Sequence, residues 1–177
     1  MLIILDRDGV INFDSPDYIK SPEEWIPIPG SIEAIAQLSK KHSVIIATNQ
    51  SGINRGLFSL DTLNKIHEKM IMQINAAGGK LKAIYFCPHT PTEDCDCRKP
   101  RPGMLLQIQK DFNVKNTDMI YIGDSEKDYE AAQAMGCSFI LVKTGNGENT
   151  SKKIQQVKMF DHLLAAALDD TFCKETQ

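Results

Sequence analysis

Short apolar runs alternate with longer amphipathic stretches along this chain, and most of the apolar runs end in polar residues. Five runs have the length of buried strands, at residues 2–5, 43–47, 83–86, 119–122 and 139–142. Helical spacing of apolar residues predicts helices between them, at residues 31–41, 60–77, 103–112 and 127–135, and a closing helix at 161–168. Strands separated by helices of this length are typical of parallel sheets with crossover connections. We therefore expect an α/β fold, a Rossmann-like doubly wound sheet that is mostly parallel and carries helices on both faces.

Residues 12–30 do not follow this alternation. They are rich in proline, serine and acidic residues and end in Pro29-Gly30, which predicts an irregular insert over the end of the first strand. An insert of this length can act as a flap, but it is too short to form a separate cap domain. The chain has no internal repeat and no low-complexity linker, so we expect a single domain over residues 1–177.

Composition narrows the classes of function. Of the 177 residues, 42% are hydrophobic and 24% are charged, and the net charge of −3 gives no global positive field of the kind that general nucleic-acid binders use. No apolar run approaches the ~20 residues of a membrane span, and Met1 leads directly into the first strand without a secretory leader. We expect a cytoplasmic monomer that acts on a small molecule rather than on nucleic acid or a membrane.

Polar side chains gather where the predicted strands end. The carboxyl ends of parallel strands share one sheet edge, where open α/β folds bind their ligands. Carboxylates there favour Mg²⁺, which takes few protein ligands together with water and phosphate oxygens. A hydroxyl, an amide and cations beside them suit the oxygens of a phosphoryl group, so the pattern predicts Mg²⁺-dependent phosphoryl transfer. The residues concerned are Asp6 and Asp8 after the first strand, Thr48 and Asn49 after the second, Arg98 and Lys99 in the loop after the third, and Asp124 and Asp128 after the fourth.

Three of the five cysteines lie within eleven residues, in the loop that follows the third strand. Cys87, Cys95 and Cys97, together with His89, offer three thiolates and one imidazole at a spacing typical of structural Zn²⁺. Four protein ligands leave no open position, so this zinc would not be catalytic. We expect it to fix the loop at residues 87–97 and thereby to place the two cations that follow Cys97. Packed thiols without a metal are the alternative.

Four segments resemble the motifs of the haloacid dehalogenase superfamily of aspartate-dependent phosphatases. Asp6-Arg-Asp8-Gly-Val resembles the first motif, and Thr48, Lys99 and Gly123-Asp124 with Asp128 resemble the second, third and fourth in the same order. Four stretches together resemble the D-glycero-D-manno-heptose 1,7-bisphosphate phosphatase family: Asp6-Arg-Asp8-Gly-Val-Ile-Asn12, Thr48-Asn-Gln-Ser-Gly-Ile-Asn-Arg-Gly56, Cys87-Pro-His89 and Cys95-Asp-Cys97-Arg-Lys-Pro-Arg-Pro-Gly103. The histidinol-phosphate phosphatases share much of this pattern and stay open as an alternative.

The resemblance implies roles for individual residues. Asp6 is expected to attack phosphorus and form an aspartyl-phosphate, and Asp8 to act as general acid and base. Asp6, the backbone carbonyl of Asp8, and Asp124 are expected to bind Mg²⁺. Thr48 and Lys99 would hold the phosphoryl oxygens. The remaining candidates are Asp128, which would orient Lys99 or a metal-bound water, and Asn49, Arg55 and Arg98, which would contact the rest of the substrate.

The implied reaction is removal of the 7-phosphate of a heptose 1,7-bisphosphate in the synthesis of lipopolysaccharide precursors. One position departs from the family pattern. Members often carry a basic residue directly after the fourth-motif aspartate, whereas this chain has Ser125 there and its nearest lysine is Lys127. Two further alternatives are a DNA 3′-phosphatase, which the lack of a basic stripe disfavours, and a zinc-stabilised interaction module without catalytic activity.

Overall fold

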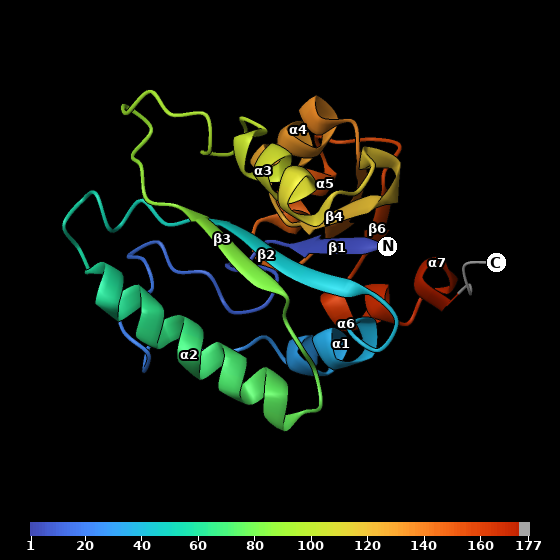
Figure 1. Cartoon of the computed structure of the whole chain (residues 1–177), viewed down its shortest axis with the longest axis horizontal. Helices are drawn as coiled ribbons and strands as arrows, with labels where there is room; N and C mark the ends of the chain where they lie inside the picture. Colours follow the sequence, from blue (N-terminus) through green and yellow to red (C-terminus); the bar gives the residue numbers. More distant parts are fainter. Residues whose placement is uncertain (174–177) are drawn as a thin grey trace.

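The computed structural model describes residues 1–173 of the chain. Six strands form one sheet in the order β3-β2-β1-β4-β5-β6, and every pair of neighbours is parallel (Figure 1). The strands are β1 (Leu2–Leu5), β2 (Ser43–Asn49), β3 (Ala83–Cys87), β4 (Met119–Gly123), β5 (Ser138–Val142) and β6 (Lys158–Phe160). The expected doubly wound α/β architecture is confirmed.

Helices cover both faces of this sheet (Figure 1). One face carries α1 (Ser31–Leu38), α2 (Leu60–Ala76) and α6 (Leu163–Ala167), and the other carries α3 (Gly103–Phe112) and α4 (Glu126–Met135). Side chains alternate along a strand, so β1 contributes to both hydrophobic clusters. Ile3 and Leu5 pack with α1 and α2, whereas Leu2 and Ile4 pack with α3 and α4. Burial on both faces explains why the central strands are almost continuously apolar.

Some elements differ from the prediction. Strand β6, the short helices α5 (Gly147–Ser151) and α7 (Asp170–Cys173), and the 3₁₀ turn η1 (Asn116–Asp118) were not expected. Several boundaries differ by one to three residues: the helix expected at 31–41 ends at Leu38, the closing helix expected at 161–168 spans Leu163–Ala167, and β2 continues through Thr48 and Asn49, which were expected in the following loop. The strand extends because Thr48 and Asn49 pair in register with the last two residues of β3.

The insert at residues 12–30 is irregular, as expected, and contains an isolated bridge between Asn12 and Pro27. It is nevertheless anchored to the domain. Trp25 is fully buried in the cluster beneath α1 and α2, and Lys69 of α2 donates a hydrogen bond of 3.0 Å to the Trp25 carbonyl oxygen. This anchor holds the insert beside the carboxyl end of β1 without forming a cap domain.

The strand order explains where a site can form. The chain runs outward from β1 through β2 and β3, returns to the centre as β4, and then runs outward again through β5 and β6. The order reverses between β1 and β4, and such switch points are where open α/β sheets bind ligands. Asp6 directly follows β1 and Asp124 directly follows β4, so both carboxylates lie at the switch point. None of the helices within residues 1–173 is long and apolar enough to cross a membrane.

Candidate active site

The polar strand ends converge on one cavity of about 590 Å³, which we call the main cavity. The insert forms part of its wall, from Asp14 to Ile19. Arg55 does not line the cavity; it lies exposed on the loop that follows β2. The predicted residues that line the main cavity are Asp6, Asp8, Thr48, Asn49, Arg98, Lys99 and Asp124.

Lys99 lies at the centre of a buried ion-pair network. Its Nζ atom is 2.9 Å from Asp6 Oδ1 and 2.7 Å from Asp128 Oδ1. The same ammonium donates hydrogen bonds to the Ala47 carbonyl oxygen at 3.0 Å and to the Tyr121 hydroxyl at 2.8 Å. Burial opposes the charge, but the carboxylates of Asp128 and Asp6 raise the pKa of Lys99 above its usual value. The ammonium is therefore held charged, at a fixed position beside Asp6.

Asp128 supports Lys99 from below the cavity. Its Oδ1 atom accepts a hydrogen bond of 2.7 Å from the Tyr121 hydroxyl, and its Oδ2 atom accepts from the Ser125 hydroxyl at 2.7 Å and the Ser125 amide at 3.1 Å. Ser125 in turn caps the start of α4. Burial opposes ionisation, yet Lys99 and the hydrogen bonds lower the pKa of Asp128. Ser125 occupies the position where family members often carry a basic residue. Here it holds Asp128, which in turn positions Lys99.

Three side chains hold the carboxylate of Asp8. Arg7 donates to Oδ1 from Nε at 3.1 Å and from Nη2 at 2.9 Å, and Asn12 donates to Oδ1 at 2.9 Å. Gln50 donates to Oδ2 at 2.8 Å and also to the Thr48 hydroxyl at 3.0 Å. Burial opposes ionisation of Asp8, but Arg7 and the two amides lower its pKa. The Asp8 carboxylate is therefore ionised without a metal.

Asp6 and Asp124 also have partners, the Lys99 ammonium and the Asn146 amide, but these do not offset the burial of the two carboxylates. Burial, and then the charge of Asp128, raises the pKa of Asp6 to about 7 and the pKa of Asp124 to about 8. Oxygen atoms of Asp6, Asp124 and Asp128 lie within 4.8 Å of one another. A cation among them would favour the ionised forms, and Mg²⁺ prefers hard oxygen ligands of this kind. Both oxygens of Asp128 are already bonded, Oδ1 to Lys99 and Tyr121 and Oδ2 to Ser125, so Asp6 and Asp124 are the carboxylates that fit Mg²⁺.

Two glycines let the backbone approach Asp124 closely. Gly9 has φ +81° and Gly145 has φ +58°, both in the left-handed region that favours glycine. A Cβ atom at either position would lie 2.2 Å from Asp124 Oδ2. That same oxygen accepts a hydrogen bond of 2.7 Å from the Asn146 amide. The turn after β1 and the turn after β5 therefore clamp this carboxylate in one orientation.

Asn49 joins the Lys99 segment to the end of β2. Its Nδ2 atom donates to the Lys99 carbonyl oxygen at 3.1 Å, and its Oδ1 atom accepts from the Lys99 amide at 3.1 Å. Both polar ends of the side chain are thus used to hold the backbone of Lys99. The expected contact of Asn49 with substrate stays a prediction.

The sulfur and nitrogen atoms of the loop at residues 87–97 also converge, and we call this segment the zinc loop. Cys87 Sγ lies 3.8 Å from Cys95 Sγ and 3.5 Å from His89 Nδ1, which is 3.3 Å from Cys97 Sγ. Tetrahedral zinc with bonds of ~2.0–2.3 Å needs ligand-to-ligand spacings of roughly 3.5–3.8 Å. Burial and then Cys97 raise the pKa of the Cys87 thiol to about 12, so a bound cation is needed to make it a thiolate. These four residues fit structural Zn²⁺.

The sequence analysis missed four residues of this site: Arg7, Asn12 and Gln50, which hold Asp8, and Tyr121, which bridges Lys99 and Asp128. Asn12 and Gln50 stand inside the stretches that carry the family resemblance. Gln50 directly follows the end of β2, and Asn12 stands four residues after Asp8, so nearness to the two polar strand ends is a signal that could have identified both. Tyr121 lies within an apolar run and was interpreted as core.

Comparisons with known proteins agree with this geometry. A family model described as HAD-hydrolase-like matches residues 96–166. Over 169 residues the chain is 51% identical to the D-glycero-β-D-manno-heptose-1,7-bisphosphate 7-phosphatase of Pseudomonas putida, which covers 94% of this chain and 97% of that protein. The corresponding enzyme of Neisseria meningitidis is 44% identical over 169 residues, covering 92% of this chain and 90% of that protein.

A solved structure gives the same result. The D,D-heptose 1,7-bisphosphate phosphatase of Bordetella bronchiseptica, complexed with magnesium and phosphate, superposes with a TM-score of 0.91 at 46% identity and covers 94% of this chain and 95% of that one. Its magnesium supports the metal chemistry inferred from Asp6 and Asp124. The resemblance indicated by the motifs is confirmed, and the chain belongs to the D-glycero-β-D-manno-heptose-1,7-bisphosphate 7-phosphatase family of haloacid dehalogenase-like hydrolases.

Proposed function

We propose that this chain is a Mg²⁺-dependent phosphatase that removes the 7-phosphate of D-glycero-β-D-manno-heptose 1,7-bisphosphate, in the synthesis of lipopolysaccharide core precursors. One observation carries the proposal: the buried Asp6 carboxylate lies at the sheet switch point, 2.9 Å from the Lys99 ammonium and within 4.8 Å of Asp124. Relatives of nearly the same length carry this activity in their names. They favour the heptose substrate over histidinol phosphate, and catalysis over a non-catalytic interaction module.

Asp6 acts as the nucleophile. Its carboxylate oxygen attacks phosphorus, the bond from phosphorus to the sugar oxygen breaks, and an aspartyl-phosphate forms on Asp6. Asp8 takes up a proton in the substrate complex and gives it to the leaving sugar oxygen, then takes a proton from the water that attacks the aspartyl-phosphate. Phosphate leaves, and both carboxyl groups return to their starting states. The bound substrate phosphate adds negative charge beside Asp8, which favours the protonated form that the first step needs.

The remaining residues bind and orient the phosphoryl group. Mg²⁺, held by Asp6, Asp124 and the Asp8 carbonyl oxygen, supplies positive charge that offsets the negative charge of the phosphoryl oxygens. Thr48 and Lys99 hold those oxygens from the protein side. Asp128 positions the Lys99 ammonium, to which it is bonded at 2.7 Å. The substrate contacts left to assign are Asn49, Arg55 and Arg98.

Phosphate release from three substrates tests this proposal: the β-anomer of the heptose bisphosphate, its α-anomer, and histidinol phosphate. With Mg²⁺ present we expect the β-anomer to have the highest kcat/KM. Asp6→Asn should abolish turnover while leaving the fold intact, and Asp118→Asn, at an exposed position in η1, is the matched control. A clear preference for histidinol phosphate would overturn the substrate, and an active Asp6→Asn enzyme would overturn the covalent mechanism.

We also infer that the enzyme works in the cytoplasm as a monomer. The residues proposed to contact the phosphoryl group line one cavity of a single chain, and Asp128 of the same chain positions Lys99, so the proposed reaction needs no residue from a second copy. Light scattering at working concentrations, with Mg²⁺ and Zn²⁺ present, tests the oligomeric state. A stable dimer would contradict the monomer.

A further inference from the structure

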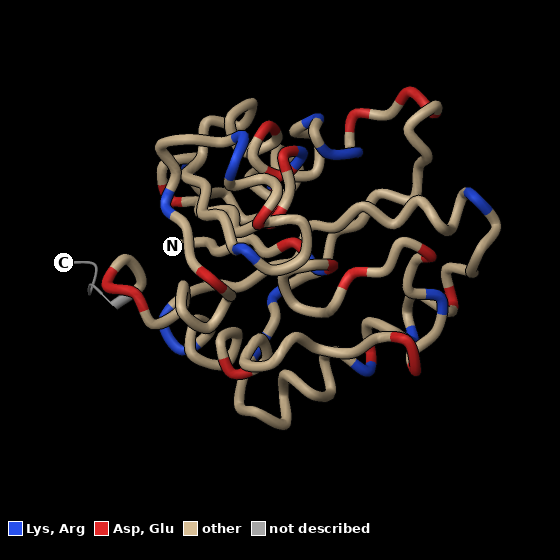
Figure 2. Tube along the Cα trace, turned by 180° about the vertical axis from the view of Figure 1, so that it is seen from behind, with Lys and Arg blue, Asp and Glu red and all other residues tan. Residues whose placement is uncertain are grey.

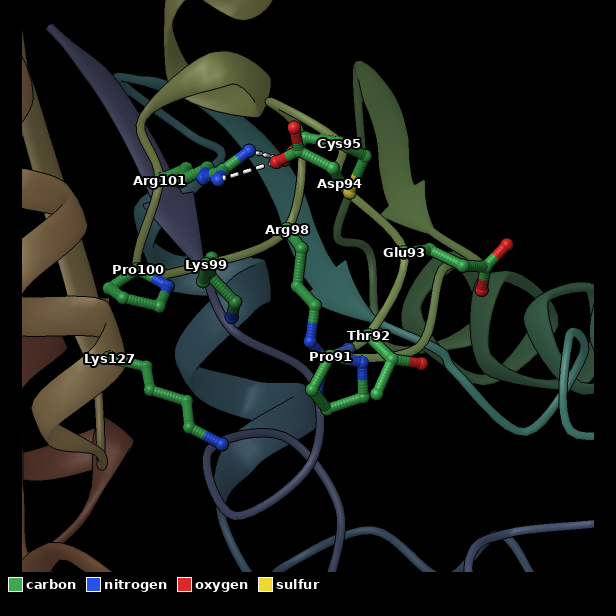
Figure 3. Close-up of a pocket in the computed structure, with 10 residues that line it drawn as sticks. All are labelled: Pro91, Thr92, Glu93, Asp94, Cys95, Arg98, Lys99, Pro100, Arg101 and Lys127. Carbon is green, nitrogen blue, oxygen red and sulfur yellow. Dashed lines mark hydrogen bonds and ion pairs between the residues drawn. The ribbon is translucent and has the colours of Figure 1, made fainter.

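Two buried cations hold the two aspartates that follow β1. Basic positions are spread along the described trace (Figure 2), yet the only Lys or Arg residues buried within residues 1–173 are Arg7 and Lys99. The Lys99 side chain extends from the segment directly after the zinc loop (Figure 3) and is bonded to Asp6. Arg7 holds Asp8, and its Nη2 atom contacts both carboxylate oxygens, at 2.9 and 3.0 Å. A buried guanidinium needs partners for its other donors too, and these partners bear on Asp8.

The Arg7 side chain lies on the α2 side of the sheet. Side chains alternate along β1, and Ile3 and Leu5 pack in the cluster with α1 and α2. Arg7 continues this series past the end of the strand, and its Nη1 atom lies 3.4 Å from Nε2 of His67 in α2. Among the described residues, only His67 forms a hydrogen bond with Nη1. The guanidinium is therefore held between the Asp8 carboxylate and an imidazole 60 positions away in sequence.

His67 accepts this hydrogen bond. Arginine has donors only, so Nε2 of His67 carries no proton, and the imidazole is the neutral form protonated on Nδ1. The surroundings favour the neutral form: burial, and then the charge of Arg7, lowers the pKa of His67 to about 4, although Asp8 opposes the shift. The contact is longer than the usual roughly 2.7–3.2 Å, so it orients the guanidinium more than it stabilises the fold.

The imidazole itself has a fixed position. His67 is 7% exposed, and Ile66 and Met70, its neighbours on α2, are fully buried in the same cluster. The His67 ring also packs beside Phe86 of β3, with ring centroids 6.3 Å apart. A helix and a strand thus fix the acceptor to which Nη1 points.

The backbone of Arg7 is fixed as well. Its amide donates a hydrogen bond of 2.7 Å to Asp6 Oδ1, and its carbonyl oxygen accepts one of 2.8 Å from the Ile11 amide. The freedom left to the guanidinium is rotation of its own side chain, and any such rotation displaces the donors that face Asp8. The contact with His67 opposes that rotation from the side away from Asp8.

We propose that His67 is a positioning residue for the reaction: it orients the Arg7 guanidinium and so keeps the Asp8 carboxylate directed at the leaving oxygen. This inference rests on the proposed function, because it takes Asp8 as the general acid and base. A misplaced catalytic group slows the step that it serves. The Lys99 ammonium is held by other groups, so binding of the phosphoryl group should change little. The effect of His67 should therefore fall on proton transfer to the leaving group.

The test compares two leaving groups in His67→Leu, which removes the acceptor and keeps an apolar side chain. A sugar oxygen needs a proton as it leaves, whereas p-nitrophenolate is a stable anion that leaves without one. The parameter is kcat/KM, which reports the steps up to formation of the aspartyl-phosphate. We expect kcat/KM to fall about three- to tenfold for the heptose bisphosphate, the scale of one hydrogen bond, and to stay within about twofold for p-nitrophenyl phosphate.

Two further variants separate the hydrogen bond from packing. His67→Gln, whose side-chain oxygen can take the place of Nε2, should restore most of the loss on the heptose bisphosphate. His67→Asn has an amide too short to reach Arg7, so it should lower the ratio of the two kcat/KM values, and it replaces His67→Leu if that variant does not fold. Equal ratios in the Gln and Asn variants would overturn the proposal.

His42→Leu is the matched control. It makes the same change at a half-buried histidine outside the main cavity, where Nε2 lies 3.0 Å from the Phe172 carbonyl oxygen. We expect a lower Tm but an unchanged ratio of the two kcat/KM values, because stability alone does not distinguish leaving groups. In His67→Leu, an equal loss on both esters or no loss on either would contradict the positioning role.

Failure of the proposed function looks different, since the wild-type enzyme would then not hydrolyse the heptose bisphosphate. Histidinol phosphate, whose leaving oxygen also needs a proton, takes its place in the ratio, and His67→Leu must still lower that ratio. A wild-type enzyme that hydrolyses none of the three esters would overturn both the function and the role of His67.

Discussion

The Tyr121 hydroxyl gives the sharpest test of how Lys99 is held. It accepts a hydrogen bond from Lys99 Nζ at 2.8 Å and donates one to Asp128 Oδ1 at 2.7 Å, with both partners buried. Tyr121→Phe removes this oxygen alone. The ring keeps its edge-to-face contact with Phe139, whose centroid is 6.1 Å away, so packing on that face of the sheet is preserved.

The expected loss of stability in Tyr121→Phe depends on which hydrogen bonds remain. Without the hydroxyl, Lys99 Nζ still has three acceptors, on Asp6, Asp128 and Ala47, and Asp128 still accepts from Lys99 and Ser125. No buried charge is left without a partner, so the cost lies near the low end for hydrogen bonds to charged groups, about 1.5–2 kcal/mol of unfolding free energy. For a chain of this size that lowers Tm by roughly 3–8 °C. We expect kcat to fall about three- to tenfold, since a less constrained ammonium is less often in place.

The assay is urea unfolding with both metals present, together with kcat on the heptose bisphosphate. Tyr85→Phe is the matched control, because the Tyr85 hydroxyl also donates to a carboxylate, Asp111 Oδ2 at 2.6 Å, but at an exposed position. That change should alter stability by no more than ~0.5 kcal/mol. Equal effects of the two substitutions, or no effect of Tyr121→Phe, would refute the idea that the Tyr121 hydroxyl supports Lys99.

Three other outcomes are expected. Gly9→Ala should abolish Mg²⁺ binding, measured by calorimetry, because its Cβ would lie 2.2 Å from Asp124 Oδ2; unchanged Mg²⁺ affinity would contradict the clamp. Zinc removal with a chelator, followed by readdition of Mg²⁺, should lower kcat and Tm, and full activity in verified zinc-free protein would show that the loop positions itself. Because the folded pKa of Asp128 lies below its unfolded value of about 3.9, the stabilisation is present above that value and is lost as pH falls through the folded pKa. The stability difference between wild type and Asp128→Asn should therefore shrink below about pH 4 in urea titrations, and a difference that stays constant from pH 7 to pH 3 would argue against an ionised Asp128.

Much of the fold was predictable because a parallel sheet buried on both faces leaves long apolar runs in the sequence. Strands β1 to β5 all carry such runs. Strand β6 does not, since it has three residues at the sheet edge and Lys158 is exposed. Its position depends on pairing with β5, which no local pattern reveals.

The residues of the site likewise fall into those with a local sequence signal and those without one. Charged residues at strand ends and the cysteine spacing are local signals, so Asp6, Asp124 and the zinc set could be predicted. The partners that hold them in place depend on register and packing. Tyr121 was interpreted as core because its neighbours are apolar, and only the docking of α4 brings Asp128 to its hydroxyl. Gln50 reaches Asp8 across the sheet edge, 42 positions away in sequence.

These contacts also clarify what the zinc loop contributes to catalysis. The Lys99 ammonium is fixed by Asp6, Asp128 and Tyr121, and its backbone by the amide of Asn49, so four of its restraints do not involve the metal. Among the described residues, the Arg98 side chain is held by one hydrogen bond, to the carbonyl oxygen of the zinc-set residue His89. Loss of zinc should therefore disturb Arg98 more than Lys99. The metal would then influence the contacts of Arg98 with the rest of the substrate more strongly than phosphoryl transfer, so zinc removal should raise KM for the heptose bisphosphate by a larger factor than it lowers kcat.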